Sequence, residues 1–247
     1  MRIGRFGEWN MTAFGIPKAV RSAARQPAVP LRNGDRLAQW DFHRRYMAYP
    51  KEVTAELVGG IVYIASCVPE PHGRFSAKVN ELFSWYHAYT PGVEVGVHAT
   101  VILDHENEVQ PDVHMRLPEQ LGGQSRVDED DWLVGAPELL AEIAYSRASI
   151  DWHLKKDAYR RSGVREYLIV SLQENEIAWF DFQTEQQIRP DECGVIRSHV
   201  FPGLWLNTTA LLAGDVLNAI DTIKQGVTSP EHARFVESLK SNGATKI

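Results

Sequence analysis

Apolar residues recur with helical spacing in two segments of the first third of the chain. Over residues 73–89 they fall at intervals of three and four, which predicts a helix that stops at the sequence TPG. A shorter helix is predicted after Asp35, its expected cap, because the apolar residues that follow lie near helical spacing. Between these segments, β-branched residues on both sides of Gly59-Gly60 predict a hairpin with a two-residue turn.

The rest of the chain alternates strand-like and helical patterns. The expected elements are strands at 92–103, 108–117 and 137–145, a helix at 149–163, strands at 164–172 and 176–183, and helices at 208–226 and 228–247. Ser149 or Asp151 would cap the 149–163 helix, and Gly163 would end it. Residues 118–136, rich in glycine and acidic residues, are expected to form a loop. This order predicts an α/β (α+β) fold, in which helices flank a mixed central sheet.

The composition indicates one globular domain with extensions. The chain has 247 residues, of which 44% are hydrophobic and 23% charged, so it can bury a sizeable core. Residues 1–35 lack a sustained period and are rich in proline, alanine and arginine, which predicts a flexible basic arm. That arm is either a solvated tail or a nucleic-acid contact. We expect the main domain at residues 36–213 and a helical extension at residues 214–247.

Charge, cysteine content and hydropathy exclude several classes of protein. A net charge of −6 is wrong for a protein that coats nucleic acid through bulk charge, although residues 1–45 and 147–165 are locally basic. This balance fits an enzyme that touches nucleic acid locally. Cys67 and Cys193 are isolated, which argues against a disulfide framework and a zinc site. The isolated thiols also make a reducing cytoplasm the expected location. No apolar run reaches the roughly 20 residues of a membrane helix.

Two acidic residues are candidates for a metal site. Asp112 follows proline in the sequence VQPDV, and Glu142 lies in the apolar run at 137–145. If their strands are neighbours, both carboxylates can share one face, where they would repel each other unless a cation lay between them. Hard oxygen ligands of this kind suit Mg²⁺ or Mn²⁺. From these two acids alone, an ordinary turn aspartate and an ordinary strand-end glutamate remain open interpretations.

The helix that follows Glu142 supplies a lysine. Many nucleases with a Pro-Asp motif carry a lysine two positions after the second acid, and that position is Ala144 here. Lys155 and Tyr159 are four apart and share a helix face, so a packed helix can bring Lys155 near the gap over Ala144. There it would hold an attacking water or stabilise charge on a phosphate. The alternative is a solvated lysine, and Tyr159 is interpreted as core. Lys156 lies about 100° round the helix, in line with Arg160.

Five segments of the chain resemble one large bacterial family. They are AELVGGIVY, VQPDV, GAPELLAEIAYS, LKKDAYRRSGVREYLIV and FPGLWLNTTALL. In this order and approximate spacing, over about residues 36–213, they resemble the Uma2 family (DUF820), a branch of the PD-(D/E)xK nuclease superfamily. The resemblance implies a restriction-endonuclease-like core and a site built from Glu56, Asp112, Glu142 and Lys155, with the lysine moved from the strand to the helix. The chain departs from the family pattern at YSRAS, residues 145–149, and at Gly59.

The leading hypothesis is a Mg²⁺-dependent or Mn²⁺-dependent endonuclease that hydrolyses DNA phosphodiester bonds. Asp112 and Glu142 would bind the metal, and Lys155 would orient or activate the attacking water. Glu56 is either a further metal or outer-sphere group or a solvated strand residue. The expected contacts to the nucleic-acid backbone are Lys156, Arg160, Arg161 and His72.

Other residues and other functions stay open. His72 is expected in a loop, where a lone histidine is more often structural or solvated than a phosphate contact. His114 and Gln110, on the expected face of Asp112, are either neighbours of the site or packing residues. The rival function is a catalytically silent nucleic-acid-binding or protein-interaction module on the same fold, and a third is a hydrolase of another phosphoester. Double-strand cutting by a one-site fold would favour a homodimer.

Overall fold

The computed structural model describes residues 29–50, 53–65 and 67–244. Most of the expected basic arm, residues 1–28, lies outside them. Within these ranges, no helix combines the length and the apolar character that crossing a membrane requires.

The end of the expected arm is packed rather than solvated. Leu31 is 2% exposed and belongs to a small apolar cluster with Phe42 and Leu57. The backbone N–H of Gly34 donates to the carbonyl of Val62 at 2.8 Å. Burial of Leu31 removes its apolar surface from water and so stabilises this packing. The folded part of the chain therefore begins before residue 36.

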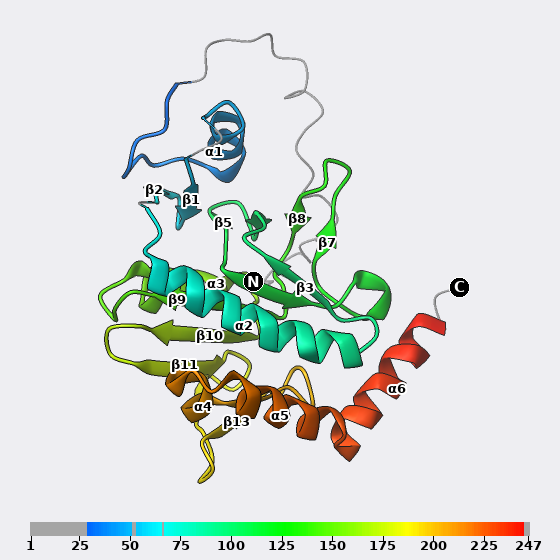
Figure 1. Ribbon diagram of the computed structural model, residues 1–247. Coiled ribbons are helices and arrows are strands. Elements are labelled where there is room, and N and C mark those ends of the chain that lie inside the picture. The colour runs from blue at the N-terminus through cyan, green and yellow to red at the C-terminus, as the bar shows by residue number, and fades with distance from the viewer. Residues whose placement is uncertain (1–28, 51–52, 66, 245–247) are drawn as a thin grey trace, which may run out of the picture.

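The larger part of the core is a mixed six-stranded sheet (Figure 1). Its strands lie in the order β12 (Gln186–Ile188), β11 (Glu176–Asp181), β10 (Glu166–Ser171), β9 (Leu139–Ala144), β6 (Val113–Arg116) and β3 (Glu94–Val97). β9 and β10 run parallel, whereas the other neighbours are antiparallel. Both central strands are buried along their whole length, as strands covered on both faces are. The predicted mixed sheet is confirmed.

A second sheet contains the predicted hairpin. Its order is β2 (Ile61–Ile64), β1 (Ala55–Val58), β5 (Glu108–Val109), β4 (Val101–Ile102), β8 (Leu133–Val134) and β7 (Arg126–Val127). The hairpin turn falls at Gly59 and Gly60, whose φ angles of 59° and 74° suit glycine in a two-residue turn. The expectation of a loop at 118–136 is wrong in part, since β7 and β8 lie there. Two-residue strands are too short for periodicity to reveal.

Two expected strands are broken because the chain passes from one sheet to the other. Residues 92–103 divide into β3 and β4, and residues 108–117 divide into β5 and β6. β5 pairs with β1 and β4, whereas β6 pairs with β3 and β9. The prediction that Gln110, Asp112 and His114 share one face of one strand is therefore wrong. Only His114 lies in a strand, and the other two belong to the connection between the sheets.

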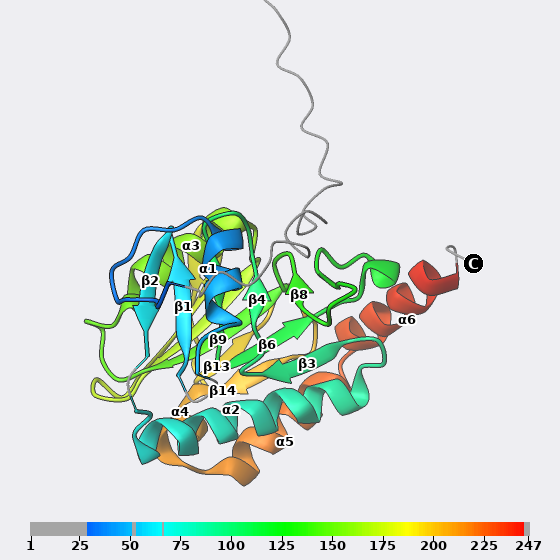
Figure 2. The ribbon, with the colours of Figure 1, turned by 90° about the horizontal axis from the view of Figure 1, so that it is seen from above.

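Helices cover both faces of the larger sheet (Figure 2). α2 (Glu70–Tyr89) and α5 (Val216–Val227) lie on the face that carries Ala141 and Ile143 of β9. α3 (Leu154–Ser162) packs on the opposite face, with Leu140 and Ala144. α2 begins three residues earlier than predicted, with a proline in its first turn. His72 thus lies in the first turn of a helix and not in a loop.

The predicted cap of the first helix is wrong, whereas the predicted end of α3 is confirmed. α1 (Gln39–Tyr46) begins after Ala38, so the expected cap by Asp35 is wrong; the Asp35 carboxylate instead accepts from the Arg32 N–H at 3.0 Å. Ser149 caps the short 3₁₀ helix η3 (Ile150–Trp152), which precedes α3. Gly163 ends α3 with a φ of 94°, as predicted.

The segment expected as a C-terminal extension is part of the main core. Gly214, with a φ of 75°, divides the predicted 208–226 helix into α4 (Thr208–Ala213) and α5. α5 contributes Ala219, Ile220 and Ile223 to the large apolar cluster, and α6 (Pro230–Ala244) contributes Leu239. A small sheet of β13 (Val195–Arg197) and β14 (Trp205–Asn207) and the 3₁₀ helix η2 (Glu119–Leu121) were not predicted.

A buried ion pair joins α1 to the second sheet and makes stability depend on pH. The Nδ1 atom of His43 lies 2.9 Å from the Glu108 carboxylate, which also accepts from the Gln39 amide at 2.8 Å. Burial, the largest single effect, lowers the pKa of His43, but the hydrogen bond with Glu108 and the negative charges of Glu108, Asp128 and Asp130 together hold that pKa above its ordinary value. Because the folded-state pKa is raised, the stabilisation is complete below about pH 6.5 and is lost as the pH rises through the folded-state value.

We expect His43→Gln to lower the free energy of unfolding by about 2 kcal/mol at about pH 5.5 and by less at about pH 9. Urea unfolding followed by circular dichroism at both pH values measures the difference. The matched control is His105→Gln, since His105 is exposed. An effect of His43→Gln that is the same at both pH values would contradict the assignment.

Candidate active site

The passage between the sheets brings Asp112 and Glu142 together. β6 and β9 are antiparallel with Val113 opposite Ala141, so Asp112 stands beside Glu142 where β6 begins. The Ile143 N–H donates to Oδ2 of Asp112 at 2.8 Å, and the Asp112 N–H donates to Oε2 of Glu142 at 3.4 Å. Each carboxylate is thus held by the backbone of the other residue's segment. Both residues are buried, which fixes their relative position.

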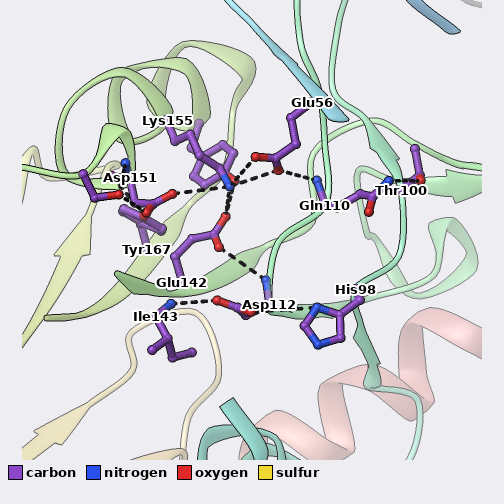
Figure 3. Close-up of polar contacts among 12 residues, drawn as sticks. Glu56, His98, Thr100, Gln110, Asp112, Glu142, Ile143, Asp151, Lys155 and Tyr167 are labelled. Carbon is purple, nitrogen blue, oxygen red and sulfur yellow. Dashed lines mark hydrogen bonds and ion pairs between the residues drawn. The ribbon is translucent and has the colours of Figure 1, made fainter. Parts of the chain in front are cut away.

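Lys155 places its ammonium among three carboxylates (Figure 3). Its Nζ atom lies 2.5 Å from Oε1 of Glu142, 3.0 Å from Oε1 of Glu56 and 3.5 Å from Oδ1 of Asp151. These acids come from β9, β1 and η3, so one side chain ties three elements together. The Lys155 side chain is only 3% exposed. The structure therefore brings together Asp112, Glu142, Lys155 and Glu56, the four residues that sequence comparison assigned to the site.

Burial and charge set the pKa values at this cluster. Burial alone would lower the pKa of the Lys155 ammonium, but the carboxylates of Glu142, Glu56 and Asp151 outweigh it and hold that pKa well above its ordinary value. Burial raises the pKa of the Glu142 carboxyl, and Lys155 opposes that rise. We conclude that Lys155 is a permanent cation, because three acidic neighbours surround it at close range.

Tyr159 and Asp151 belong to the cluster and were missed as functional residues. Tyr159 is fully buried, as its interpretation as core requires, but its hydroxyl also donates to Oε1 of Glu142 at 2.6 Å. The sequence indicated this role only through the position of Tyr159, four residues after Lys155 on the same helix face. Asp151 was considered only as a helix cap. It lies four residues before Lys155, and its backbone carbonyl accepts from the Tyr167 hydroxyl at 3.1 Å.

Glu56 lies between the lysine and the connection that carries Asp112. Its carboxylate accepts from Lys155 through both oxygens, at 3.0 and 3.2 Å. The Gln110 N–H donates to the same carboxylate at 2.6 Å. Glu56 is half-buried, so the interpretation of it as a solvated strand residue is wrong. Its contacts make it a group that fixes Lys155 and the backbone two residues before Asp112.

Two histidines lie near the Asp112 carboxylate. Nε2 of His72 lies 3.3 Å from Oδ2 of Asp112, and Nδ1 of His98 lies 3.8 Å from Oδ1. The hydrogen bond with Asp112 raises the pKa of His72. His98 is 63% exposed and has a φ of 50°, an uncommon conformation for a residue other than glycine. Sequence patterns missed His98 because they placed it inside an unbroken strand.

Two other candidates from the sequence have packing roles. The His114 ring fills the space above Gly96 on the neighbouring strand, where a methyl group on Gly96 would clash with it. Burial lowers the pKa of His114 to about 4, so the ring is neutral near pH 7. The Gln110 side chain turns away from the acids and donates to the Tyr46 and Thr100 hydroxyls, at 2.8 and 3.2 Å.

The basic residues of α3 lie outside the carboxylate cluster. The Lys156 amine stands over the Phe180 ring, 3.6 Å from its centre, and burial lowers its pKa. Arg160 and Arg161 both pair with Asp157, at 3.0 and 3.3 Å, and are exposed. Much of the positive charge that the sequence suggested for a nucleic-acid backbone is therefore compensated within the helix.

Asp112 and Glu142 are the residues that could hold a divalent cation. Mg²⁺ commonly uses one or two carboxylates and keeps several waters. Within residues 29–50, 53–65 and 67–244, no group of three or more His, Cys, Asp or Glu side chains is arranged to hold a metal ion. The donor set therefore suits a hard, partly hydrated cation and not a closed zinc site.

Comparisons with known proteins give a family and a fold for the chain. The sequence model of the Uma2 family, described as "Putative restriction endonuclease", matches residues 41–209. No curated protein matches the chain. Among solved structures, the chain is similar to "a putative nuclease belonging to DUF820" from Anabaena variabilis, with 12% identity and a TM-score of 0.54 over 69% of this chain and 96% of that one.

At 12% identity the structural likeness shows the fold, and the fold is that of the DUF820 protein. The family match extends over more than half of the sequence and includes β1, β9 and α3, which carry Glu56, Glu142 and Lys155. This chain belongs to the Uma2 family.

Proposed function

We propose that this protein is a nuclease that hydrolyses DNA phosphodiester bonds with the help of Mg²⁺ or Mn²⁺. The observation that carries the proposal is the meeting of Asp112, Glu142 and Lys155 from three separate segments. Two carboxylates beside a buried ammonium are costly to assemble, because each charge must be taken out of water. Clusters of buried charges such as this one are typical of functional sites.

The residues fit a divalent cation at the Asp112–Glu142 edge. Oε1 of Glu142 is engaged by Lys155 and Tyr159, whereas Oε2 is turned toward Asp112. The carboxylate oxygens on that edge are the hard donors that Mg²⁺ and Mn²⁺ prefer. A bound cation would supply Lewis-acid activation of the phosphate and of a water molecule.

The chain's own groups have separable roles in this proposal. Lys155 holds a positive charge next to Glu142, where it can donate to a phosphate oxygen and stabilise the charge that develops there. Tyr159 and Glu56 keep Glu142 and Lys155 in place through their hydrogen bonds. His72, beside Asp112 in the first turn of α2, is placed to contact a phosphate of the substrate. Cutting of both strands would require two such sites, and a homodimer would supply them.

The departure at YSRAS leaves the proposed machinery intact. Arg147 of this segment pairs with Glu176 on β11 and stacks its guanidinium over Trp152, 5.4 Å from the ring centre. Its charge is therefore directed along the sheet and not at Asp112.

We expect Asp112→Asn, Glu142→Gln and Lys155→Met each to reduce plasmid cleavage at least about 100-fold, because each removes one group of the site. Gel analysis of plasmid DNA with Mg²⁺, with Mn²⁺ and with EDTA measures the effect. Lys240→Met, on α6, is the control for the loss of a lysine. Equal cleavage by the wild type and all three variants would point to a contaminating enzyme. Absence of cleavage and of Mn²⁺ binding in the wild type would favour the silent binding module.

The Tyr159 hydroxyl gives a second, finer prediction. We expect Tyr159→Phe to fold but to require about tenfold more Mn²⁺ for half-maximal binding, because Glu142 loses the hydrogen bond that orients it. Isothermal titration calorimetry measures the affinity without DNA. Tyr167→Phe is the matched control: Tyr167 is equally buried, but its hydroxyl donates to the Asp151 carbonyl. An unchanged Mn²⁺ affinity in Tyr159→Phe would remove Tyr159 from this role.

A further inference from the structure

A cavity lies on the α2 face of the sheet, beside the candidate active site. It has a volume of about 210 Å³ and is lined by residues that include Arg74, Phe75, Lys78, Ser171, Asn175 and Leu212. A single water needs only about 10–15 Å³ by the same measure, so the cavity admits a much larger group. Its lining combines apolar side chains with two basic ones, Arg74 and Lys78.

One stripe of α2 supplies the basic side chains of this lining. Pro71, Arg74, Phe75 and Lys78 are three and four residues apart, so they project from one side of the helix. The Lys78 ammonium lies 5.5 Å from the centre of the Phe75 ring. Among the residues that the structure describes, no carboxylate lies within ion-pair distance of it. Arg74 has one weak partner, since Glu70 is 3.6 Å away and both side chains are exposed.

The cavity and the carboxylates occupy the same end of the sheet. On β10, Ile169 stands opposite Glu142, and the cavity residues Val170 and Ser171 are the next two. On α2, His72 touches Asp112, and Arg74 follows two residues later. Figure 1 shows the start of α2, the end of β10 and α4 at this end. The first turn of α2 therefore contacts Asp112 through His72 and lines the cavity through Pro71.

We propose that this cavity is a subsite for a backbone phosphate of the nucleic-acid strand, with Arg74 and Lys78 as its cationic ligands. The inference rests on the proposed function and deepens it by giving the path of the substrate. It places the main backbone contact on α2 and not on α3, where Arg160 and Arg161 share the Asp157 carboxylate and Arg160 also lies 3.5 Å from Glu185. Asn175 adds a polar group and the apolar residues of the lining can accept the sugar, whereas the Ser171 hydroxyl is buried and donates to the Glu174 carboxylate.

The test is the salt dependence of DNA binding by the full chain with Asp112→Asn, which cannot cut in our proposal. Fluorescence anisotropy of a short labelled duplex gives the dissociation constant over a range of NaCl concentrations. We expect Arg74→Gln and Lys78→Gln each to reduce the slope of log K against log [salt] by about 1, and the double variant by about 2. Glu70→Gln should strengthen binding, because it frees Arg74. Lys240→Gln, whose partner is Glu237 on α6, should leave the slope unchanged.

Three outcomes decide the matter. A reduced slope in the α2 variants with an unchanged slope in Lys240→Gln supports the subsite, as does a rise in KM for cleavage without a fall in kcat when Asp112 is intact. Equal slopes in all variants overturn the subsite, even if the wild type cleaves DNA. If the wild type does not cleave while the α2 variants lose slope, the proposed catalytic function fails and the phosphate subsite stands.

Discussion

The site depends on the ion pairs between the buried ammonium of Lys155 and its acidic neighbours. Three carboxylates from β1, β9 and η3 lie within 3.5 Å of it, and removing a charge from water costs several kcal/mol unless a partner is close. Lysine and acids therefore stabilise one another only in this arrangement. Displacement of α3 would separate the buried ammonium from Glu142 and Glu56, so the cluster fixes the hairpin against the larger sheet as well as forming the site.

The second constraint is the connection at residues 110–112, where the chain leaves one sheet for the other. A continuous strand would have sent alternate side chains to opposite faces, and Asp112 would have been one residue among many. The break instead frees the Gln110 and Asp112 N–H groups from the ladder, and they donate to Glu56 and Glu142. The same backbone groups that end the strand thus orient the acids.

Much of this could be predicted from the sequence, because it depends on patterns within single elements. The hairpin at Gly59-Gly60, α2 and the strand of Glu142 follow from local periodicity, and Lys155 follows from helix geometry joined to a family resemblance. The strand breaks could not be predicted, since whether a strand changes sheets depends on its neighbours. The Tyr159 hydroxyl and Asp151 were missed for a related reason: both satisfy an ordinary local role while their polar atoms contact another element.

In our proposal, backbone binding and chemistry use opposite faces of the larger sheet. On the α3 face, Lys155 is enclosed by acids, and Arg160 and Arg161 share Asp157, with Glu185 as a second partner of Arg160, so the positive charge of this helix is partly offset. On the α2 face, Arg74 and Lys78 stand beside a cavity with little opposing charge. A phosphate backbone follows uncompensated charge and not the total count of basic residues. The chain's net charge of −6 is consistent with a site that draws its substrate through a few well-placed cations.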